Sequence, residues 1–411
     1  IVAIYTLDFY FTKMKQKSIR FVKYCMIKKG FVLFFLCTSL FSQDKLLLKQ
    51  ADILTSSAIG NETITRLDGN IIFQKTDTTL KGNFATQSDK NSIINLYGDV
   101  SVQQPEQIIY CDSLSYNNDT EFFEMFGNIK IKNGSRLISA DKATLDQISN
   151  QMTLIDNCEI NEKDRNRVYG DKIILDFKEK TLHSFKVLSN GIIFSKNSGY
   201  EKIDDLEKNI ENEDILKAET ILANLENDEI QNIELIGMAS TLIHLYNDSL
   251  YDGINEVSGD KITMNIHNES AKRLVAEGGT IGRYIPNKSN KNIQEEIDYV
   301  ADRVEFEVEK KISEMYGVVK IIHDKMDLSA AHINVDWSTN VLEAFSDNPF
   351  NQEEINRPIL IENNREPMTG DTMVYNIKSR KGKVLMGESR IQENVYMGSQ
   401  ITSVTDSTFY I

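Results

Sequence analysis

A four-residue pattern recurs along this chain at nearly constant spacing, and it limits the folds that the chain can adopt. Each copy has a small residue, an acid, any residue and then an apolar one, and Asp112, Asp141 and Asp171 follow one another at nearly equal intervals. A fixed period of this size is typical of a stacked array, in which each unit buries its apolar face against its neighbours. The copies begin at Cys111, Ala140, Gly170, Gly259, Ala301 and Gly370, with a looser one at Ala218.

The stretch from 300 to 337 shows how one unit is built. Val304, Phe306 and Val308 alternate with charged residues. Because successive side chains of a strand point to opposite faces, this segment is predicted to be a half-buried strand. Polar turns separate it from two further alternating segments, with no room for a helix between them. The sequence therefore predicts an antiparallel meander.

Glycines follow the acids at a regular distance. Gly127 follows Asp112 at the same distance as Gly317 follows Asp302. Glycine within a strand relieves crowding or forms a bulge. Together with the period, this predicts an all-β fold, an elongated and open solenoid of stacked antiparallel strands.

The charge of the chain is unevenly distributed. The net charge is −15 over 411 residues. Residues 1–42 contain seven Lys or Arg and one acid, so the remainder carries −21. An acidic body argues against nucleic acid as a partner, because binding phosphates requires clustered Lys and Arg.

The start of the chain resembles a secretory signal. Met26–Lys29 is a short basic region, Gly30–Phe41 is mostly apolar, and Ser42 is suited to be the last residue before cleavage. The apolar run is shorter than the roughly 20 residues of a spanning helix. A non-cleaved anchor or a core segment is the alternative. Export together with β-repeats indicates the periplasm of a double-membraned bacterium.

Three polar stretches interrupt the strand pattern. Residues 197–216 are rich in acids without alternation, which predicts a solvated loop or a short helix. Proline is excluded from central strands, and three of the five prolines lie between 348 and 367. The predicted division is 1–42, signal peptide and upstream segment; 43–285, β-repeats; 286–298, polar linker or insertion; 299–346, a further repeat; 347–369, proline-containing linker; and 370–411, the start of a β region that continues beyond the chain.

The sequence has no recognisable catalytic constellation. The histidines are isolated, without the spacing of a metal site, and neither a phosphate-binding glycine loop nor a nucleophile elbow is present. The recurring acids repeat with the fold, so we expect them to serve turns or strand edges. We therefore predict that the protein is not an enzyme and has no catalytic residue, metal or cofactor.

Two cysteines follow the predicted signal peptide, Cys111 and Cys158. In an oxidising compartment they could form a disulfide. Two separately buried thiols are the alternative, because sequence alone does not show whether the Cα atoms come within reach.

Five short segments share a common strand order. They are Phe126–Ile131 (FGNIKI), Leu137–Asp141 (LISAD), Ala301–Phe306 (ADRVEF), Tyr316–Ile321 (YGVVKI) and Leu328–Ile333 (LSAAHI). These segments resemble the OstA-like family, and the likeness covers roughly residues 50–345. In one copy His332 stands where the family usually has Asp. The residues from Met373 to Gly398 are similar to the segment that leads into the membrane part of the outer-membrane lipopolysaccharide-assembly protein.

This resemblance implies a twisted, open β-jellyroll whose interior groove carries the acyl chains of lipopolysaccharide between two membranes. It implies lipopolysaccharide as ligand and other lipopolysaccharide-transport proteins as partners that pair with free edge strands. It also implies a periplasmic location, with an outer-membrane association through a missing C-terminal part. A slab with one apolar face must indeed close on itself or hold something apolar, and its end strands can accept another strand.

Two rival functions remain open at this point. A purely structural or adhesive β-solenoid would have an interior filled by side chains. A right-handed β-helix enzyme acting on polysaccharide would need a unique acidic or basic cluster, and none is seen. If the jellyroll reading holds, the groove is lined by apolar residues of the alternating face. The candidates are Ile71, Phe73, Val100, Val102, Ile129, Ile131, Ile173, Leu175, Ile262, Met264, Val304, Phe306, Val319 and Ile321.

Overall fold

The computed structural model describes residues 46–162, 165–178, 181–203, 206–227, 229–267, 270–290, 293–348, 351–362, 366–391, 394–405 and 408–410. Contacts between Cα atoms divide the chain into two units, Ile1–Gln43 and Asp44–Ile411. All described residues belong to the second unit. The predicted signal peptide and upstream segment, residues 1–42, lie outside the described residues.

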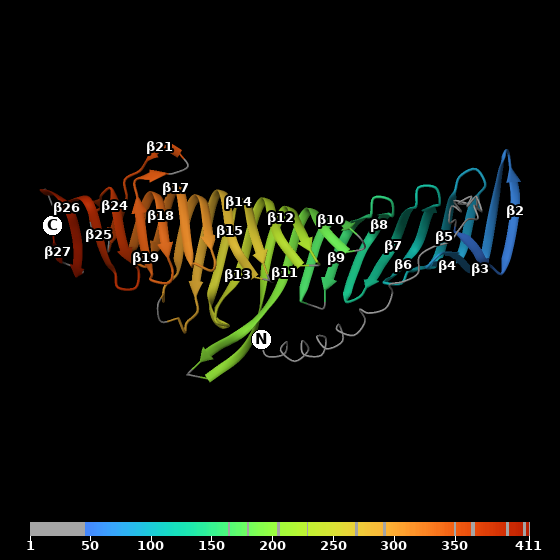
Figure 1. Cartoon of the computed structure of the whole chain (residues 1–411), viewed down its shortest axis with the longest axis horizontal. Coiled ribbons are helices and arrows are strands. Elements are labelled where there is room, and N and C mark those ends of the chain that lie inside the picture. Colours follow the sequence, from blue (N-terminus) through green and yellow to red (C-terminus); the bar gives the residue numbers. More distant parts are fainter. Residues whose placement is uncertain are drawn as a thin grey trace, which may run out of the picture. The chain divides into compact units, whose positions relative to one another are not determined.

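The second unit is built of β-strands that follow one another in chain order (Figure 1). Of the described strands, 25 form one sheet, and almost all its pairings are antiparallel and join strands that are consecutive in sequence. No helix occurs among the described residues. The predicted all-β fold of stacked antiparallel strands is confirmed. The first ten strands are β1 (Leu47–Gln50), β2 (Ile53–Ile59), β3 (Glu62–Lys75), β4 (Thr78–Ser88), β5 (Ile93–Gln103), β6 (Gln107–Asn117), β7 (Phe122–Asn133), β8 (Arg136–Asp146), β9 (Gln151–Glu162) and β10 (Asn166–Lys178).

The strands are longer than the alternating segments of the sequence suggest. Those near the middle reach 23 residues, and β7 and β17, on either side of the middle, have 12 each. The next nine are β11 (Thr181–Ile203), β12 (Leu206–Glu226), β13 (Glu229–Asn247), β14 (Leu250–His267), β15 (Ser270–Pro286), β16 (Ile297–Glu307), β17 (Ile312–His323), β18 (Met326–Asp336) and β19 (Val341–Phe345).

From β3 to β17, a bulge interrupts every second strand at the same level of the sheet. In β7, for example, two residues, Gly127 and Asn128, stand opposite one residue of β8. Both bulge residues have left-handed φ values, 74° and 47°. Equivalent left-handed pairs occur in β3, β5, β9, β11, β13 and β15. Since bulges bend a strand, this row forms one continuous corner along the sheet.

The recurring motif occupies this corner. In the copies at Cys111, Ala140 and Gly170, the acid lies in the strand before the bulge and accepts a hydrogen bond from a bulge side-chain amide. Asn128 Nδ2 donates to Asp112 Oδ2 at 2.8 Å, Asn157 Nδ2 to Asp141 Oδ2 at 2.7 Å and Asn190 Nδ2 to Asp171 Oδ2 at 2.7 Å. The prediction that the acids serve turns or strand edges is therefore wrong. They lie inside strands, opposite a bulge in the middle of the neighbouring strand, and they bind that bulge.

The first position of the motif holds a small residue for steric reasons. A Cβ added to Gly170 would lie 2.2 Å from Val187 Cγ1, and one added to Gly370 would lie 2.3 Å from Val384 Cγ1. Ala301 at the equivalent place is 1% exposed. At Gly170 and Gly370 the inner side of the corner therefore has no room for a Cβ, whereas Cys111, Ala140 and Ala301 show that a small side chain fits in other copies.

The corner folds the sheet onto itself and divides it into two arms. The A arm contains the strand segments on the side of Phe122–Phe126 and Ile312–Tyr316, and the B arm contains those on the side of Ile129–Asn133 and Val319–His323. Lys75 at the B end and Glu121 at the A end are ion-paired at 2.6 Å. A strand of about 11 residues is about 36 Å long when straight, so the two ends can meet only because the arms face each other.

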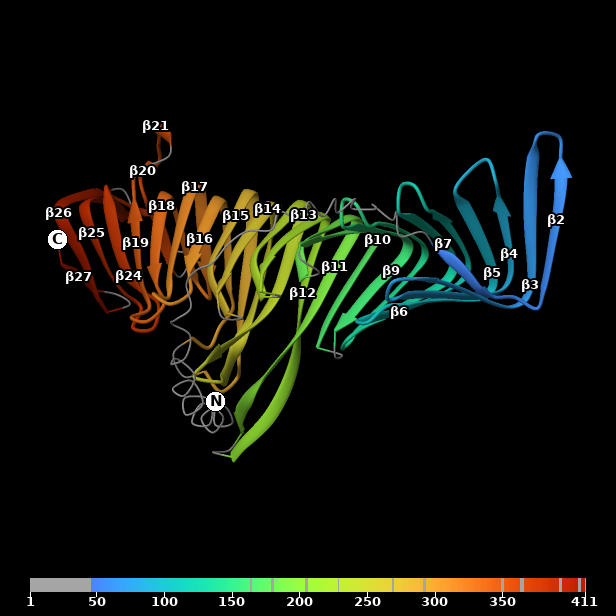
Figure 2. The same ribbon diagram turned by 45° about the vertical axis from the view of Figure 1, so that its right-hand side comes forward.

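The predicted loop or short helix at 197–216 is wrong. These residues extend β11 and β12 into a hairpin whose pairing runs from Asn197–Asn212 to Ile203–Leu206. The hairpin reaches beyond the neighbouring strands (Figure 2), and among the described strands only one bridge, from Tyr200 to Leu250, joins it to another strand. The described side chains of the hairpin are exposed or half-buried, so its strands need no apolar alternation. Cross-strand pairs of opposite charge, such as Lys202 and Glu207, hold the two strands together instead.

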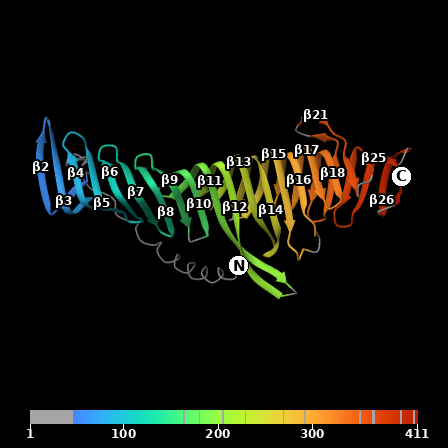
Figure 3. The same ribbon diagram turned by 180° about the vertical axis from the view of Figure 1, so that it is seen from behind.

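The predicted linkers lie within the same sheet. Tyr284 of β15 pairs with Ile297 of β16 across the 286–298 loop. The 347–369 segment is also not a plain linker: it contains an excursion, the β20–β21 hairpin beside β17 and β18 (Figure 3), followed by β22, which pairs with β18. The prolines flank these short strands, so the sequence pattern did not predict the strands. The last strands are β20 (Asp347–Asn348), β21 (Asn351–Ile355), β22 (Ile359–Glu362), β23 (Met368–Thr369), β24 (Thr372–Asn376), β25 (Lys381–Ile391), β26 (Asn394–Thr405) and β27 (Thr408–Tyr410).

Candidate lipid-contacting interior

The space between the two arms is lined by one continuous apolar core. Every predicted lining residue belongs to it or packs against it. All but one are at most 7% exposed, and the exception, Phe306, is half-buried against the same core. Period-2 alternation thus identified the inner face in both arms, Ile131 in the B arm and Val304 in the A arm being examples.

The interior is filled by these side chains over most of its length. Phe73, Ile129 and Ile131 are each 1% exposed, and Leu154 and Ile173 are fully buried. Such values are typical of a packed core. Any apolar ligand that enters this interior must therefore displace the contacts between the arms.

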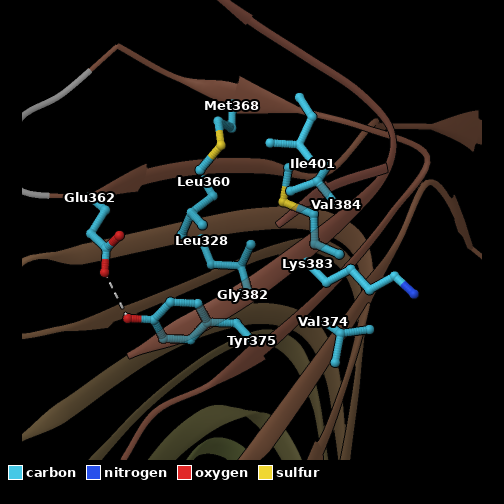
Figure 4. Close-up of a pocket in the computed structure, with 11 residues that line it drawn as sticks. Leu328, Leu360, Glu362, Met368, Val374, Tyr375, Gly382, Lys383, Val384 and Ile401 are labelled. Carbon is cyan, nitrogen blue, oxygen red and sulfur yellow. Dashed lines mark hydrogen bonds between the residues drawn. The ribbon is translucent and has the colours of Figure 1, made fainter. Parts of the chain in front are cut away.

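A recess of about 350 Å³, which includes space open to solvent, lies between the arms near the C-terminal end. Figure 4 shows its lining, which comes from β18, β22, the short β23, and β24 to β26. The sequence pattern did not predict this site, because most of its residues lie beyond the last predicted repeat. The lining consists of Leu328, Leu360, Glu362, Met368, Met373, Val374, Tyr375, Gly382, Lys383, Val384 and Ile401.

Polar groups stand at the rim of this recess. The Tyr375 hydroxyl donates a hydrogen bond of 2.9 Å to Glu362 Oε1, from the A arm to the B arm (Figure 4). Tyr375 itself is 3% exposed, and Lys383 is exposed. The recess thus combines an apolar floor with one acid and one base at its edge, which suits an amphipathic ligand.

The first repeats have a comparable contact between the arms. Lys75 Nζ lies 2.6 Å from Glu121 Oε1 and 3.3 Å from the Tyr116 hydroxyl. Burial alone would lower the pKa of Lys75, but the bonds to Glu121 and Tyr116 outweigh it and raise the pKa. The lysine therefore stays charged, and it holds the ends of the two arms together.

The two cysteines are free thiols, and both are buried. The alternative of a disulfide between them is wrong in this structure. Cys111 lies in β6 and Cys158 in β9, three strands apart, each at the corner of its own repeat. Burial raises the pKa of Cys111 to about 12 and that of Cys158 to about 11, so neither is a reactive thiolate near neutral pH.

A buried polar network joins the base of the β11–β12 hairpin to β13. Asp214 Oδ1 accepts a bond from the backbone N–H of His244 at 2.8 Å and lies 3.0 Å from His244 Nδ1. Burial raises the pKa of Asp214 despite these bonds. Each of its described partners belongs to a neighbouring strand, so the network anchors the hairpin. In the described part of the chain, no three His, Cys, Asp or Glu residues gather as a metal site would require.

Comparison with known proteins gives one family. The model of the family described as "OstA-like protein" matches residues 43–171, which confirms the predicted resemblance for that region. Among the residues that the structure describes, no helix has the length and apolarity to span a bilayer. The comparison with curated proteins gives no match.

Among solved structures, the crystal structure of LptH from Pseudomonas aeruginosa is similar to part of this chain. Its title describes LptH as the LptA homologous periplasmic component of the conserved lipopolysaccharide transport device. The match has 15% identity and a TM-score of 0.25, and it covers 28% of this chain and 86% of the LptH chain.

Proposed function

We propose, from the OstA-like region at residues 43–171, that this protein works in lipopolysaccharide transport in the periplasm. In this proposal the acyl chains lie between the A and B arms, against the predicted lining residues of the alternating inner face. The observation that carries the proposal is an apolar interior that runs through the whole folded sheet of a chain with an OstA-like region. Side chains of the same chain, such as Lys75 and Glu121, join the free ends of the arms, so an apolar ligand can be covered without a separate lid.

We infer that the protein has no catalytic role. Three of the acids that recur in the sequence, Asp112, Asp141 and Asp171, are engaged at the corner, where each accepts a hydrogen bond from a bulge amide. A catalytic carboxylate would need to face a substrate instead. This use of the acids supports transport or structure over hydrolysis of a glycan.

The end strands support partners of the same architecture. Strand β2 pairs with β3 alone among the described strands, and its residues 53–58 are exposed, including Ile53 at 59% and Leu54 at 58%. An unpaired, apolar edge of this kind can accept a strand from another protein. We propose that other lipopolysaccharide-transport proteins pair there, and that the outer membrane is reached through such contacts.

A structural β-solenoid is the second candidate, and the filled interior favours it. Side chains such as Leu80 and Ile94 are fully buried by the chain itself. A purely structural array has the same packing. The two functions differ in whether an acyl chain reaches the inner face, and that can be measured.

The test is photo-crosslinking of lipopolysaccharide to the purified chain. A photoreactive phenylalanine analogue at Ile131 points to the interior, and the same analogue at its neighbour Lys130 points outward. Crosslinks from position 131 but not from 130, together with co-purified lipopolysaccharide, are expected. If neither position crosslinks and no lipopolysaccharide co-purifies, the transport proposal is wrong and the structural solenoid replaces it.

A further inference from the structure

Among the described residues, side-chain contacts join the free ends of the A and B arms at five places. Each links residues from opposite ends of the strand ladder and not from neighbouring strands. They are Lys75 with Glu121 (2.6 Å), Asn247 with Lys311 (3.1 Å), Asp324 with Arg380 (2.7 Å), Glu362 with Tyr375 (2.9 Å) and the rings of Tyr284 and Trp337 (6.4 Å between centroids).

These contacts share one geometry. The B-arm partner Lys75 ends β3, and its A-arm partner Glu121 precedes β7; Asn247 ends β13, and Lys311 precedes β17. In both cases the A-arm residue lies further along the chain, so the free end of one repeat meets that of a later repeat. The contacts therefore close the side of the interior that lies opposite the corner.

We infer that these contacts are latches, and that an acyl chain reaches the interior only where a latch parts. This inference rests on the proposed function. The corner is held by bulges, short contacts and ladder hydrogen bonds, whereas the five contacts on the opposite side are made by side chains. Because the interior is already filled, room for an acyl chain must come from separation of the arms at that side.

The latch between Tyr375 and Glu362 controls the recess near the C-terminal end. Both residues line the recess and come from different arms. The ion pair between Arg380 and Asp324 also joins the two arms. Asp324 lies in the turn between β17 and β18, and Arg380 lies in the turn between β24 and β25. Loss of the Tyr375 hydrogen bond should therefore ease entry at this recess without removing any apolar lining.

A hydroxyl deletion tests this latch. Tyr375→Phe keeps the ring and removes the donor. The matched control is Tyr169→Phe, because the Tyr169 hydroxyl donates to Glu159 Oε1 at 3.0 Å between neighbouring strands of one arm. The probe is dansyl-undecanoic acid, whose fluorescence rises in an apolar site. We expect Tyr375→Phe to raise the rate of uptake roughly tenfold, as expected for a hydrogen bond to a charged group, and Tyr169→Phe to leave it unchanged.

A reversible lock gives the opposite perturbation. Asp324→Cys and Arg380→Cys together allow a cleavable bifunctional maleimide to join the arms. The native Cys111 and Cys158 are buried and react poorly. We expect the lock to slow uptake of the probe and cleavage of the linker to restore it.

The outcomes separate the latch from the proposed function. If the unmodified chain takes up no probe and binds no lipopolysaccharide, the proposed function is wrong. If the chain takes up probe, but the two tyrosine variants behave alike and the lock has no effect, lipid does not enter through the latched side and the inference is overturned.

Discussion

Replacing Gly127 by Ala should destabilise one repeat through two separable effects. Gly127 has φ 74°, and a Cβ added there would lie 2.2 Å from Asp112 Oδ2. The left-handed backbone costs an Ala about 1–2 kcal/mol. The displaced carboxylate also loses its 2.8 Å bond to Asn128, a further contribution of about 1 kcal/mol at an exposed site. We expect a total loss of roughly 2–3 kcal/mol in the local free energy of opening.

Gly134→Ala is the matched control. Gly134 has φ 56°, but nothing lies within 4 Å of the added Cβ. Its variant should lose only the backbone contribution of about 1–2 kcal/mol. Asp112→Ala completes a double-mutant cycle with Gly127→Ala. Without the carboxylate, only the Cβ of residue 112 remains close, at 3.0 Å, so the second substitution should cost little more than Gly134→Ala does.

Hydrogen exchange of the peptide that contains β7, read by mass spectrometry, is the suitable assay. A stacked array need not unfold as one unit, so a global melt can hide a loss in a single repeat. The proposed stabilisation of the corner by Asp112 is refuted if Gly127→Ala and Gly134→Ala exchange alike. It is also refuted if removal of the Asp112 carboxylate does not reduce the cost of the alanine.

Three further predictions concern the core, an acid and the thiols. Ile131→Asp should lower the free energy of unfolding by several kcal/mol, because it places a charge in the packed core. Lys130→Asp on the outer face should change the melting temperature little. Burial would raise the pKa of Glu305, but its bonds to Arg273 and Arg303 outweigh this and lower it. Its stabilisation is therefore present above the unfolded pKa of about 4.3 and lost as pH falls through the lower folded value, so the deficit of Glu305→Gln in urea unfolding should shrink as the pH falls below about 4. Peptides that carry Cys111 and Cys158 should acquire an alkyl label only in denaturant, and a disulfide that links them in the native protein would contradict the structure.

The corner was only partly predictable from the sequence. Gly69, Gly98 and Gly127 are equally spaced along the chain, and each opens a left-handed pair. Asp156–Asn157 continues that spacing, and Ser189–Asn190 forms the next pair, both without glycine. They escape a search for glycine, although Asn and Asp are the residues that adopt this conformation most readily after glycine. A search for glycine, Asn or Asp at this spacing would have found Asp156–Asn157.

The inner face was predictable because its chemistry is periodic, whereas the recess and the latches were not. Alternation places Ile129 and Val319 inside from local sequence alone. A contact such as Arg380 with Asp324 joins residues 56 positions apart, and its partner is set by the offset between the arms. The β11–β12 hairpin was missed for a related reason. Its strands are held by cross-strand polar pairs, which leave no apolar period to detect.

The corner and the free ends of the arms differ in the free energy that is needed to separate the arms there. A surface ion pair such as Arg380 with Asp324 contributes about 0–1 kcal/mol, and the Tyr375 bond to Glu362 about 1.5–3 kcal/mol. Parting the arms at one repeat breaks one or two such contacts and no ladder hydrogen bond. The remaining cost is apolar surface exposed to water, about 25 cal/mol per Å², and an entering acyl chain covers that surface again. Because the corner is specified by backbone geometry, local opening leaves the neighbouring repeats paired. A sheet built in this way can admit an apolar chain at one place and stay folded elsewhere, which is a property that a lipid carrier requires and a structural solenoid does not.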